Sequence, residues 1–131
     1  MAERKPFIGD FRELGVYRKA LDFSNKIYKI VEKFPIYERN NLSDQLRRCS
    51  SSIFANIAEG NSNYYYRKEI DRLNTALGST AESRSFTDLA VMQNYITLEE
   101  YKELDRDAEE ITKMLIGMIN RLERILKEGE S

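Results

Sequence analysis

The strongest constraint on the fold is a heptad repeat late in the chain. Its apolar residues alternate steps of three and four: Tyr101, Leu104, Ala108, Ile111, Leu115, Met118, Leu122 and Ile125. A stripe sustained over about 25 residues is typical of a long helix that packs at a shallow angle in a bundle or coiled coil. Thr97 and Glu100 form a capping box before it, and Gly129 is expected to end it. We therefore predict a helix over about 98–128.

Three further helices are predicted from apolar periodicity and the residues that interrupt it. The first, about 11–34, ends before Pro35, because the residue preceding a proline is biased away from helical geometry. The second, about 41–60, begins at an asparagine cap at 40 or 41 and ends at Gly60, which suits a left-handed terminus. The third, about 65–94, is weaker, since Gly78 and the serines and threonines of 79–87 lower helix propensity.

The predicted buried faces follow the same periods. The first helix carries Tyr17, Ala20, Leu21, Ser24, Ile27, Tyr28, Val31 and Phe34. The second carries Leu42, Leu46, Cys49, Ile53 and Ile57, and the third carries Ile70, Leu73, Leu77, Thr80 and Val91. No segment alternates with period two, so no sheet is expected. Short connections favour antiparallel neighbours, and we predict one all-α domain over 1–131, an antiparallel up-down-up-down four-helix bundle.

Charge and composition narrow the setting. No apolar run approaches the roughly 18 residues of a membrane span, and the charged start lacks a signal-peptide apolar region. The single cysteine is compatible with a reducing compartment, so we expect a cytoplasmic protein without a membrane partner. The net charge is −1, yet residues 1–68 carry 13 Lys/Arg against 8 Asp/Glu, and residues 69–131 carry 8 against 14. This asymmetry indicates either antiparallel helices that attract one another or a basic face kept for a polyanion.

The residue types argue against catalysis. Histidine, the commonest general base and metal ligand, is absent. Ser50, Ser51 and Ser52 lack a base and a nucleophile elbow, and Cys49 lies on a core stripe, so these residues are interpreted as packing groups. An acidic cluster on the fourth helix is interpreted as a solvated face: Asp105, Asp107, Glu109 and Glu110. We expect no enzyme activity, no metal, no cofactor and no small-molecule substrate.

Two short stretches are candidates for nucleic-acid contact. Arg47 and Arg48 differ by about 100° around a helix. Either of them can bind phosphate, or one, Arg48 in particular, can form a partly buried ion pair with Glu82 or Glu59. Arg67 and Lys68 directly follow three tyrosines, Tyr64, Tyr65 and Tyr66. Aromatic rings beside cations can stack on unpaired bases, or they can anchor a protein interface.

The order of residues resembles a known family. The stretches Gln45-Leu46-Arg47-Arg48-Cys49, Ser52-Ile53 and Asn56-Ile57-Ala58-Glu59-Gly60 resemble the second-helix signature of the bacterial "four helix bundle protein" family. Its members are relatives of the protein encoded in intervening sequences of large-subunit ribosomal RNA genes. The likeness extends to Phe34-Pro35, Lys68-Glu69 and Ala76-Leu77-Gly78-Ser79 with Glu82, and covers roughly residues 11 to 126.

The resemblance implies an antiparallel four-helix bundle that assembles into a homopentamer. It also implies a link to RNA, through the gene's setting and through a distant relative, the accessory protein of diversity-generating retroelements. That relative works with a reverse transcriptase and its RNA and is usually strongly basic, whereas this chain carries a net charge of −1.

The leading expectation is a non-catalytic oligomeric bundle that binds RNA or a ribonucleoprotein through Arg47, Arg48, Arg67 and Lys68, with Tyr64–Tyr66 as stacking or interface groups. The alternatives are a reverse-transcriptase accessory protein and a structural adaptor whose patches bind proteins.

Overall fold

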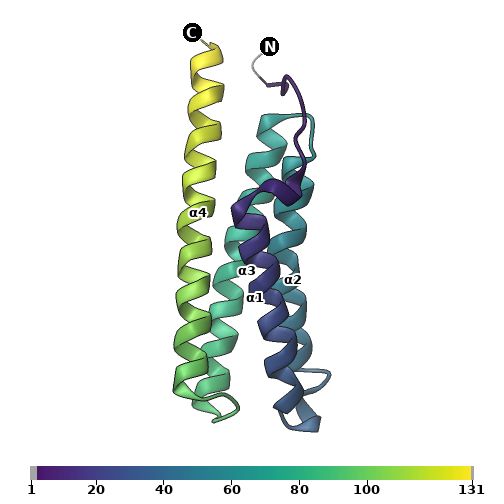
Figure 1. Cartoon of the computed structure of the whole chain (residues 1–131), viewed down its shortest axis with the longest axis vertical. Coiled ribbons are helices and arrows are strands. Elements are labelled where there is room, and N and C mark those ends of the chain that lie inside the picture. Colours follow the sequence, from purple (N-terminus) through teal and green to yellow (C-terminus); the bar gives the residue numbers. More distant parts are fainter. Residues whose placement is uncertain (1–2, 131) are drawn as a thin grey trace.

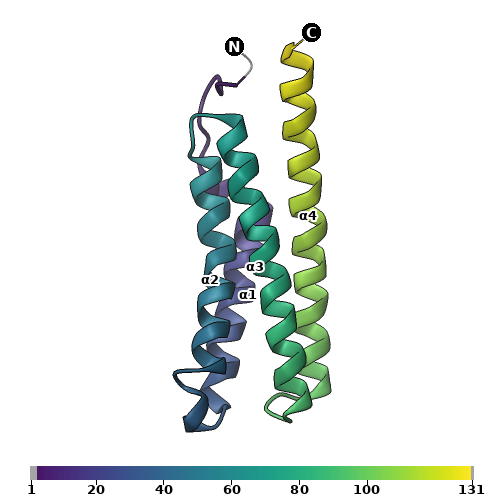
Figure 2. The same cartoon turned by 180° about the vertical axis from the view of Figure 1, so that it is seen from behind.

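A computed structural model describes residues 3–130 and has four α-helices with no strand in that range. They are α1 (Gly15–Ile30), α2 (Leu42–Asn61), α3 (Tyr66–Met92) and α4 (Leu98–Glu130). Short 3-10 turns, η1 (Phe11–Glu13), η2 (Val31–Lys33) and η3 (Ile36–Glu38), flank α1 and lead into α2. The predicted antiparallel four-helix bundle is confirmed (Figure 1, Figure 2). Within residues 3–130, every helix is either too short or too polar to span a bilayer.

The two ends of the bundle differ in what they hold. The end called here the upper end carries the α2–α3 connection and both ends of the described chain (Figure 1). The lower end carries the connections 31–41 and 93–97. Helix α4 is the longest helix and extends well past the start of α1 toward the upper end (Figure 1). Segment 3–10 runs beside the α2–α3 connection instead of joining a helix.

The α3–α4 connection is formed by two local motifs. The capping box is confirmed: the Glu100 amide donates to Thr97 Oγ1 at 3.0 Å, and the Thr97 amide donates to Glu100 Oε1 at 2.8 Å. Helix α3 ends at a left-handed residue, Asn94, with φ 63°. The Tyr95 amide donates to Ala90 O at 3.0 Å, which completes the bond pattern of a Schellman motif.

The asparagine and glycine residues that were predicted to begin and end the helices do not play those roles. Asn41 precedes α2 without a side-chain cap, and the Glu38 carboxylate accepts from the Leu42 amide at 3.4 Å instead. Gly60 lies inside α2, and no described glycine has a positive φ. Glycine is needed there because α3 passes close by: a Cβ at position 60 would lie 3.1 Å from Arg72 Cβ. Gly129 also lies within its helix, since α4 continues to residue 130.

The core follows the predicted stripes most closely on α2 and α4. All five predicted α2 residues are buried, and the α4 stripe is buried or half-buried along its length. On α1 the predicted stripe is partly wrong. Leu21 and Tyr28 were predicted to be buried but are exposed, whereas Val16 and Phe23 are buried and were not predicted. Each exposed residue directly follows a buried one, so a rotation of about 100° carries it off the core face.

Small polar side chains fill the seams between α2 and its neighbours. Ser24 on α1 and Ser50 on α2 lie 3.1 Å apart (Oγ–Oγ), and Ser52 on α2 and Ser79 on α3 lie 2.8 Å apart. On α3, the hydroxyls of Thr80 and Ser83 donate to carbonyls one turn back, at 2.8 and 2.9 Å. The polar middle of α3 therefore stays helical because its hydroxyls are hydrogen-bonded within the helix while their small volume lets α2 approach closely.

Cys49 belongs to the same packing layer. Its sulfur is buried and accepts a hydrogen bond from Ser83 Oγ at 3.2 Å. Burial raises the pKa of the Cys49 thiol, which disfavours the reactive thiolate. The interpretation of the serine run and Cys49 as packing groups fits this geometry.

Candidate nucleic-acid interface

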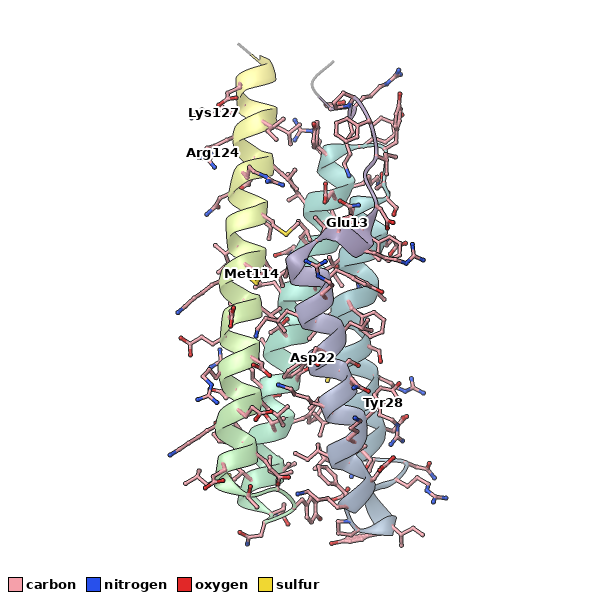
Figure 3. All side chains as sticks on the ribbon, in the orientation of Figure 1. Glu13, Asp22, Tyr28, Met114, Arg124 and Lys127 are labelled. Atoms are coloured by element: carbon pink, nitrogen blue, oxygen red, sulfur yellow. The ribbon has the colours of Figure 1, made fainter. Side chains whose placement is uncertain are left out.

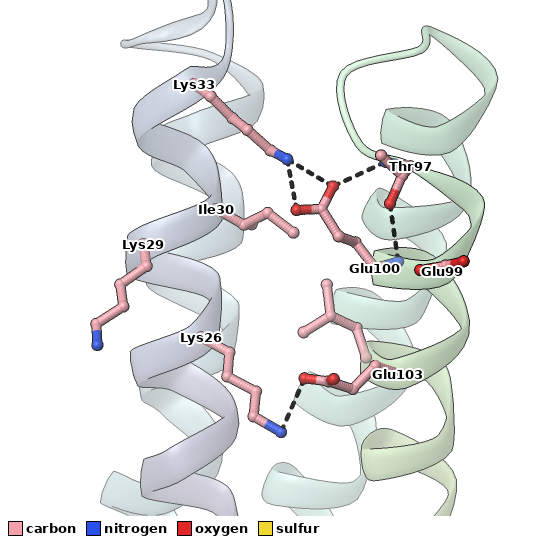
Figure 4. A pocket seen from close by; sticks show the side chains of 9 residues that line it. Lys26, Lys29, Ile30, Lys33, Thr97, Glu99, Glu100 and Glu103 are labelled. Atoms are coloured by element: carbon pink, nitrogen blue, oxygen red, sulfur yellow. Dashed lines mark hydrogen bonds and ion pairs between the residues drawn. The ribbon is translucent and has the colours of Figure 1, made fainter.

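The groove between α1 and α4, about 500 Å³, is spanned by ion pairs. Figure 4 shows Lys26 of α1 and Lys33 of η2 reaching to Glu103 and Glu100 on α4, whereas Lys29 points away. Lys26 Nζ also lies 2.8 Å from Asp107 Oδ2, and this hydrogen bond raises the pKa of Lys26. Two of the three lysines are thus neutralised from within, so this seam offers little attraction to a polyanion.

This seam accounts for part of the charge asymmetry along the chain. Lysines 19, 26 and 33 recur at seven-residue steps along α1 and η2, and each of them pairs with acidic side chains of α4. The acidic cluster on α4 is therefore only partly a solvated face. Asp107 is shared by Lys19 and Lys26, and Asp105 accepts two bonds from Arg84 on α3, at 2.8 and 3.1 Å. Across the described residues, no group of acidic and cysteine side chains is placed to hold a metal ion.

The upper end presents an exposed aromatic pair beside cations. Tyr64 and Tyr65 are 48% and 41% exposed, and their rings meet edge to face with centroids 5.4 Å apart. The Arg4 guanidinium lies 5.9 Å from the Tyr64 ring centroid. Arg67 and Lys68 follow in the first turn of α3 and are both exposed. Arg67 binds Glu3 at 3.4 Å.

Tyr66 differs from its two neighbours, because it is half-buried and packs against the core. Only Tyr64 and Tyr65 of the predicted trio are therefore free to stack on a ligand. Arg124 and Lys127 also lie toward the upper end of α4 (Figure 3), and Lys127 lines a groove between α3 and α4 together with Arg67.

A buried ion pair fixes the N-terminal segment against this end. The side chains of Lys5 and Glu69 are 7% and 6% exposed, and Lys5 Nζ lies 2.8 Å from Glu69 Oε1. The same ammonium donates to the carbonyls of Gly60 and Asn61, at 3.1 and 2.9 Å, at the C-terminal end of α2. A cation is favourable there because the last carbonyls of a helix carry partial negative charge.

Backbone hydrogen bonds reinforce this attachment. The Lys5 amide donates to Tyr64 O at 3.0 Å, and the Tyr66 amide donates to Glu3 O at 2.8 Å. Arg4 and Tyr65 thereby form an isolated antiparallel bridge. Arg4 and Lys5 were missed at the sequence level, because no periodicity in segment 3–10 connects it with a turn some 60 residues later.

Arg47 and Arg48 lie in the lower half of α2, well away from the tyrosines. Arg48 is 78% exposed at its side chain and pairs with Asp44 on its own helix at 3.0 Å. The Arg47 side chain is 30% exposed and donates to Arg39 O at 3.1 Å, so Arg47 is the arginine that turns toward the core edge. About 20 Å of helix separates Arg48 from the α2–α3 connection. The predicted cations therefore form two sites rather than one patch.

Arg48 forms neither of its predicted ion pairs, with Glu82 on α3 or with Glu59 on its own helix, and pairs with Asp44 instead. Glu59 pairs with Arg72 on α3 at 3.3 Å, and Glu82 forms no ion pair with a described residue. Asp44 lies one turn from Arg48 on the same exposed face, so the intrahelical pair forms without bringing the long arginine side chain across the packed α2–α3 seam.

Comparison with known proteins agrees with this architecture. A family model described as "23S rRNA-intervening sequence protein" matches residues 12–117. A crystal structure of a protein of unknown function from the S23 ribosomal protein family of Bacteroides thetaiotaomicron is similar, with 33% identity and a TM-score of 0.70. The alignment covers 79% of this chain and 97% of that one. No curated protein gave a significant match. The chain belongs to the 23S rRNA-intervening sequence protein family.

Proposed function

We propose that this protein is a non-catalytic, oligomeric helical bundle that binds RNA or a ribonucleoprotein through basic surfaces. The observation that carries the proposal is the exposed Tyr64–Tyr65 pair at the upper end, with Arg4 over one ring and Arg67 and Lys68 beside it. Membership in a family named for 23S rRNA intervening sequences supports the same class of partner.

The chemistry of the upper end suits unpaired nucleotides. Aromatic side chains stack on splayed bases, and such stacking tolerates any base because every base has a π-face. Arg67, Lys68 and Arg4 would then contact the phosphates on either side. Arg47 and Arg48 would supply a second contact about 20 Å along α2, within reach of one structured RNA.

Oligomerisation strengthens such an interface. The chain carries a net charge of only −1, so attraction to RNA must come from local patches rather than from an overall basic field. A homopentamer would present five copies of each patch, and weak contacts on one RNA would then act together through a high effective concentration.

The test is salt-dependent binding to a structured RNA with a single-stranded loop. The double variant Arg67→Ala/Lys68→Ala is expected to weaken binding about tenfold and to flatten the salt dependence by one or two counterions. Lys102→Ala/Arg106→Ala, which removes two exposed cations from α4, is the matched control and should bind as the parent does. Binding that does not weaken with salt, or equal losses in both variants, would refute the proposal.

A second function, a protein adaptor, is favoured by the lower end. Its exposed apolar side chains come from both connections and the adjoining helix ends: Ile36, Tyr37, Met92 and Leu98. Clustered apolar exposure is typical of protein interfaces. Ile36→Ser/Met92→Ser should then change the sedimentation of the oligomer or abolish co-purification of a partner such as a reverse transcriptase. If neither changes, the adaptor function loses its support.

A further inference from the structure

A second groove, at the lower end, has the composition of a small anion site. It occupies about 460 Å³ between the end of α1, the turn η3 and the first turns of α2. Buried Val31 and Phe34 form its floor, and exposed Tyr28 and Ile36 stand at its edge. Tyr28 lies on the α1–α2 side, where its hydroxyl is 3.3 Å from Ser51 Oγ (Figure 3). The volume of the groove lies within the range of roughly 300–1,000 Å³ that is typical of small-molecule sites.

Two guanidinium groups line this groove. Arg47 is held in place by its bond to Arg39 O, and its nearest carboxylate, Asp44, is 4.0 Å away and already paired with Arg48. Arg39 is exposed and makes no ion pair with any residue in the described range. Glu32 is the single acidic residue of the lining, against two arginines. Unlike the lysines between α1 and α4, these cations are therefore not neutralised by the fold.

A serine borders the same space. Ser43 lines the groove and is 3% exposed as a whole residue. Its hydroxyl can donate a hydrogen bond to a polar ligand in the groove or accept one from it.

We propose that this groove binds a single unpaired nucleotide. The phosphate lies on Arg39 and Arg47, whose planar forks match phosphate oxygens. The base packs on Tyr28 and Ile36, and Ser43 bonds a polar atom of the nucleotide. The inference rests on the proposed RNA function and assigns Arg47 a specific partner. An RNA end or bulge and a free nucleoside monophosphate share this chemistry, and the experiment separates them.

The experiment uses the full chain with two probes. The first is adenosine 5′-monophosphate, followed by calorimetry, and the second is an RNA hairpin with a short single-stranded tail, followed by fluorescence anisotropy. Arg39→Gln and Tyr28→Ala change exposed side chains, and each should lower the affinity for the probe about tenfold. Arg106→Gln, an exposed arginine on α4 outside the groove lining, is the matched control and should change binding less than twofold. Thermal melting confirms that each variant is folded.

The outcomes separate the two proposals. If the hairpin binds and its affinity falls in the groove variants, the nucleotide bound in the groove comes from RNA. If only the monophosphate binds and its affinity falls in those variants, the groove takes free nucleotides and the RNA function fails. If the hairpin depends on Arg67 and Lys68 but not on Arg39 and Tyr28, the groove inference is overturned and the RNA function stands. Binding of neither probe overturns both.

Discussion

Replacing Lys5 tests how much one buried ion pair contributes to the upper end of the bundle. Lys5→Met keeps the length of the side chain but removes the ammonium. Glu69 then loses the ammonium that is paired with it, and the carbonyls of Gly60 and Asn61 lose a donor. Because the Glu69 side chain is 6% exposed, water cannot replace Lys5 while segment 3–10 stays in place.

The magnitude follows from these contacts. Removing one partner of a buried pair costs about 3–5 kcal/mol, because the other charge is left uncompensated. Segment 3–10 belongs to no helix, however, and its detachment would hydrate Glu69 and limit the loss. We therefore expect a loss of about 3 kcal/mol in the free energy of unfolding, or roughly 10 °C in Tm for a chain of this size.

Two measurements check this expectation. Urea denaturation gives the loss of stability, and hydrogen exchange at the Tyr66 amide, which donates to Glu3 O at 2.8 Å, reports detachment of the segment. Lys5→Met/Glu69→Met is the control, since an apolar pair of similar volume should recover most of the stability. The reasoning would be refuted by a stability loss below about 1 kcal/mol with unchanged hydrogen-exchange protection of the Tyr66 amide. It would also be refuted if the double variant lost as much stability as the two single variants combined.

Three further predictions concern packing and charge. Gly60→Ala should lower stability by about 1–3 kcal/mol because of the approach of α3, whereas Gly78→Ala, with nothing within 4 Å of the added methyl group, should raise it by about 0.5–1 kcal/mol; thermal melting distinguishes the two. Asp107→Asn should cost about 1–2 kcal/mol by removing the carboxylate that Lys19 and Lys26 share, and a loss unchanged in high salt would contradict this. The hydrogen bond from Lys33, helped by the Thr97 amide, holds the pKa of Glu100 below its ordinary 4.5. The Glu100 carboxylate therefore contributes fully to stability above that pH, and its contribution is lost as the pH falls through the lower folded pKa. Glu100→Gln should accordingly make the free energy of unfolding less dependent on pH under acidic conditions.

The positions of the helices could be predicted from sequence because their signals are local. The α4 stripe and the Thr97–Glu100 box depend on residues three or four positions apart, and both predictions were confirmed. Helix limits came within a few residues, apart from the first helix, whose predicted 11–34 divides into α1 and two 3-10 turns. The weak middle of α3 was harder, since its propensity is low and only packing against α2 explains its buried hydroxyls.

The candidate site could be predicted only in its local part. Tyr64, Tyr65, Arg67 and Lys68 are neighbours in sequence, so their grouping required no knowledge of the fold. Arg48 was predicted to pair with Glu82 or Glu59, but it pairs with Asp44, one turn away on its own helix.

What only the tertiary structure decided is which distant residues meet. Lys5 reaches the end of α2 across 55 residues, and Gly60 is needed because α3 passes beside it. The lower groove likewise joins Tyr28 of α1 to Arg47 of α2. Apolar period and capping specify each helix through neighbours within a turn or so. The rotation and offset of one helix against another depend instead on the packing of the whole core, and those two quantities determine which polar side chains share a surface.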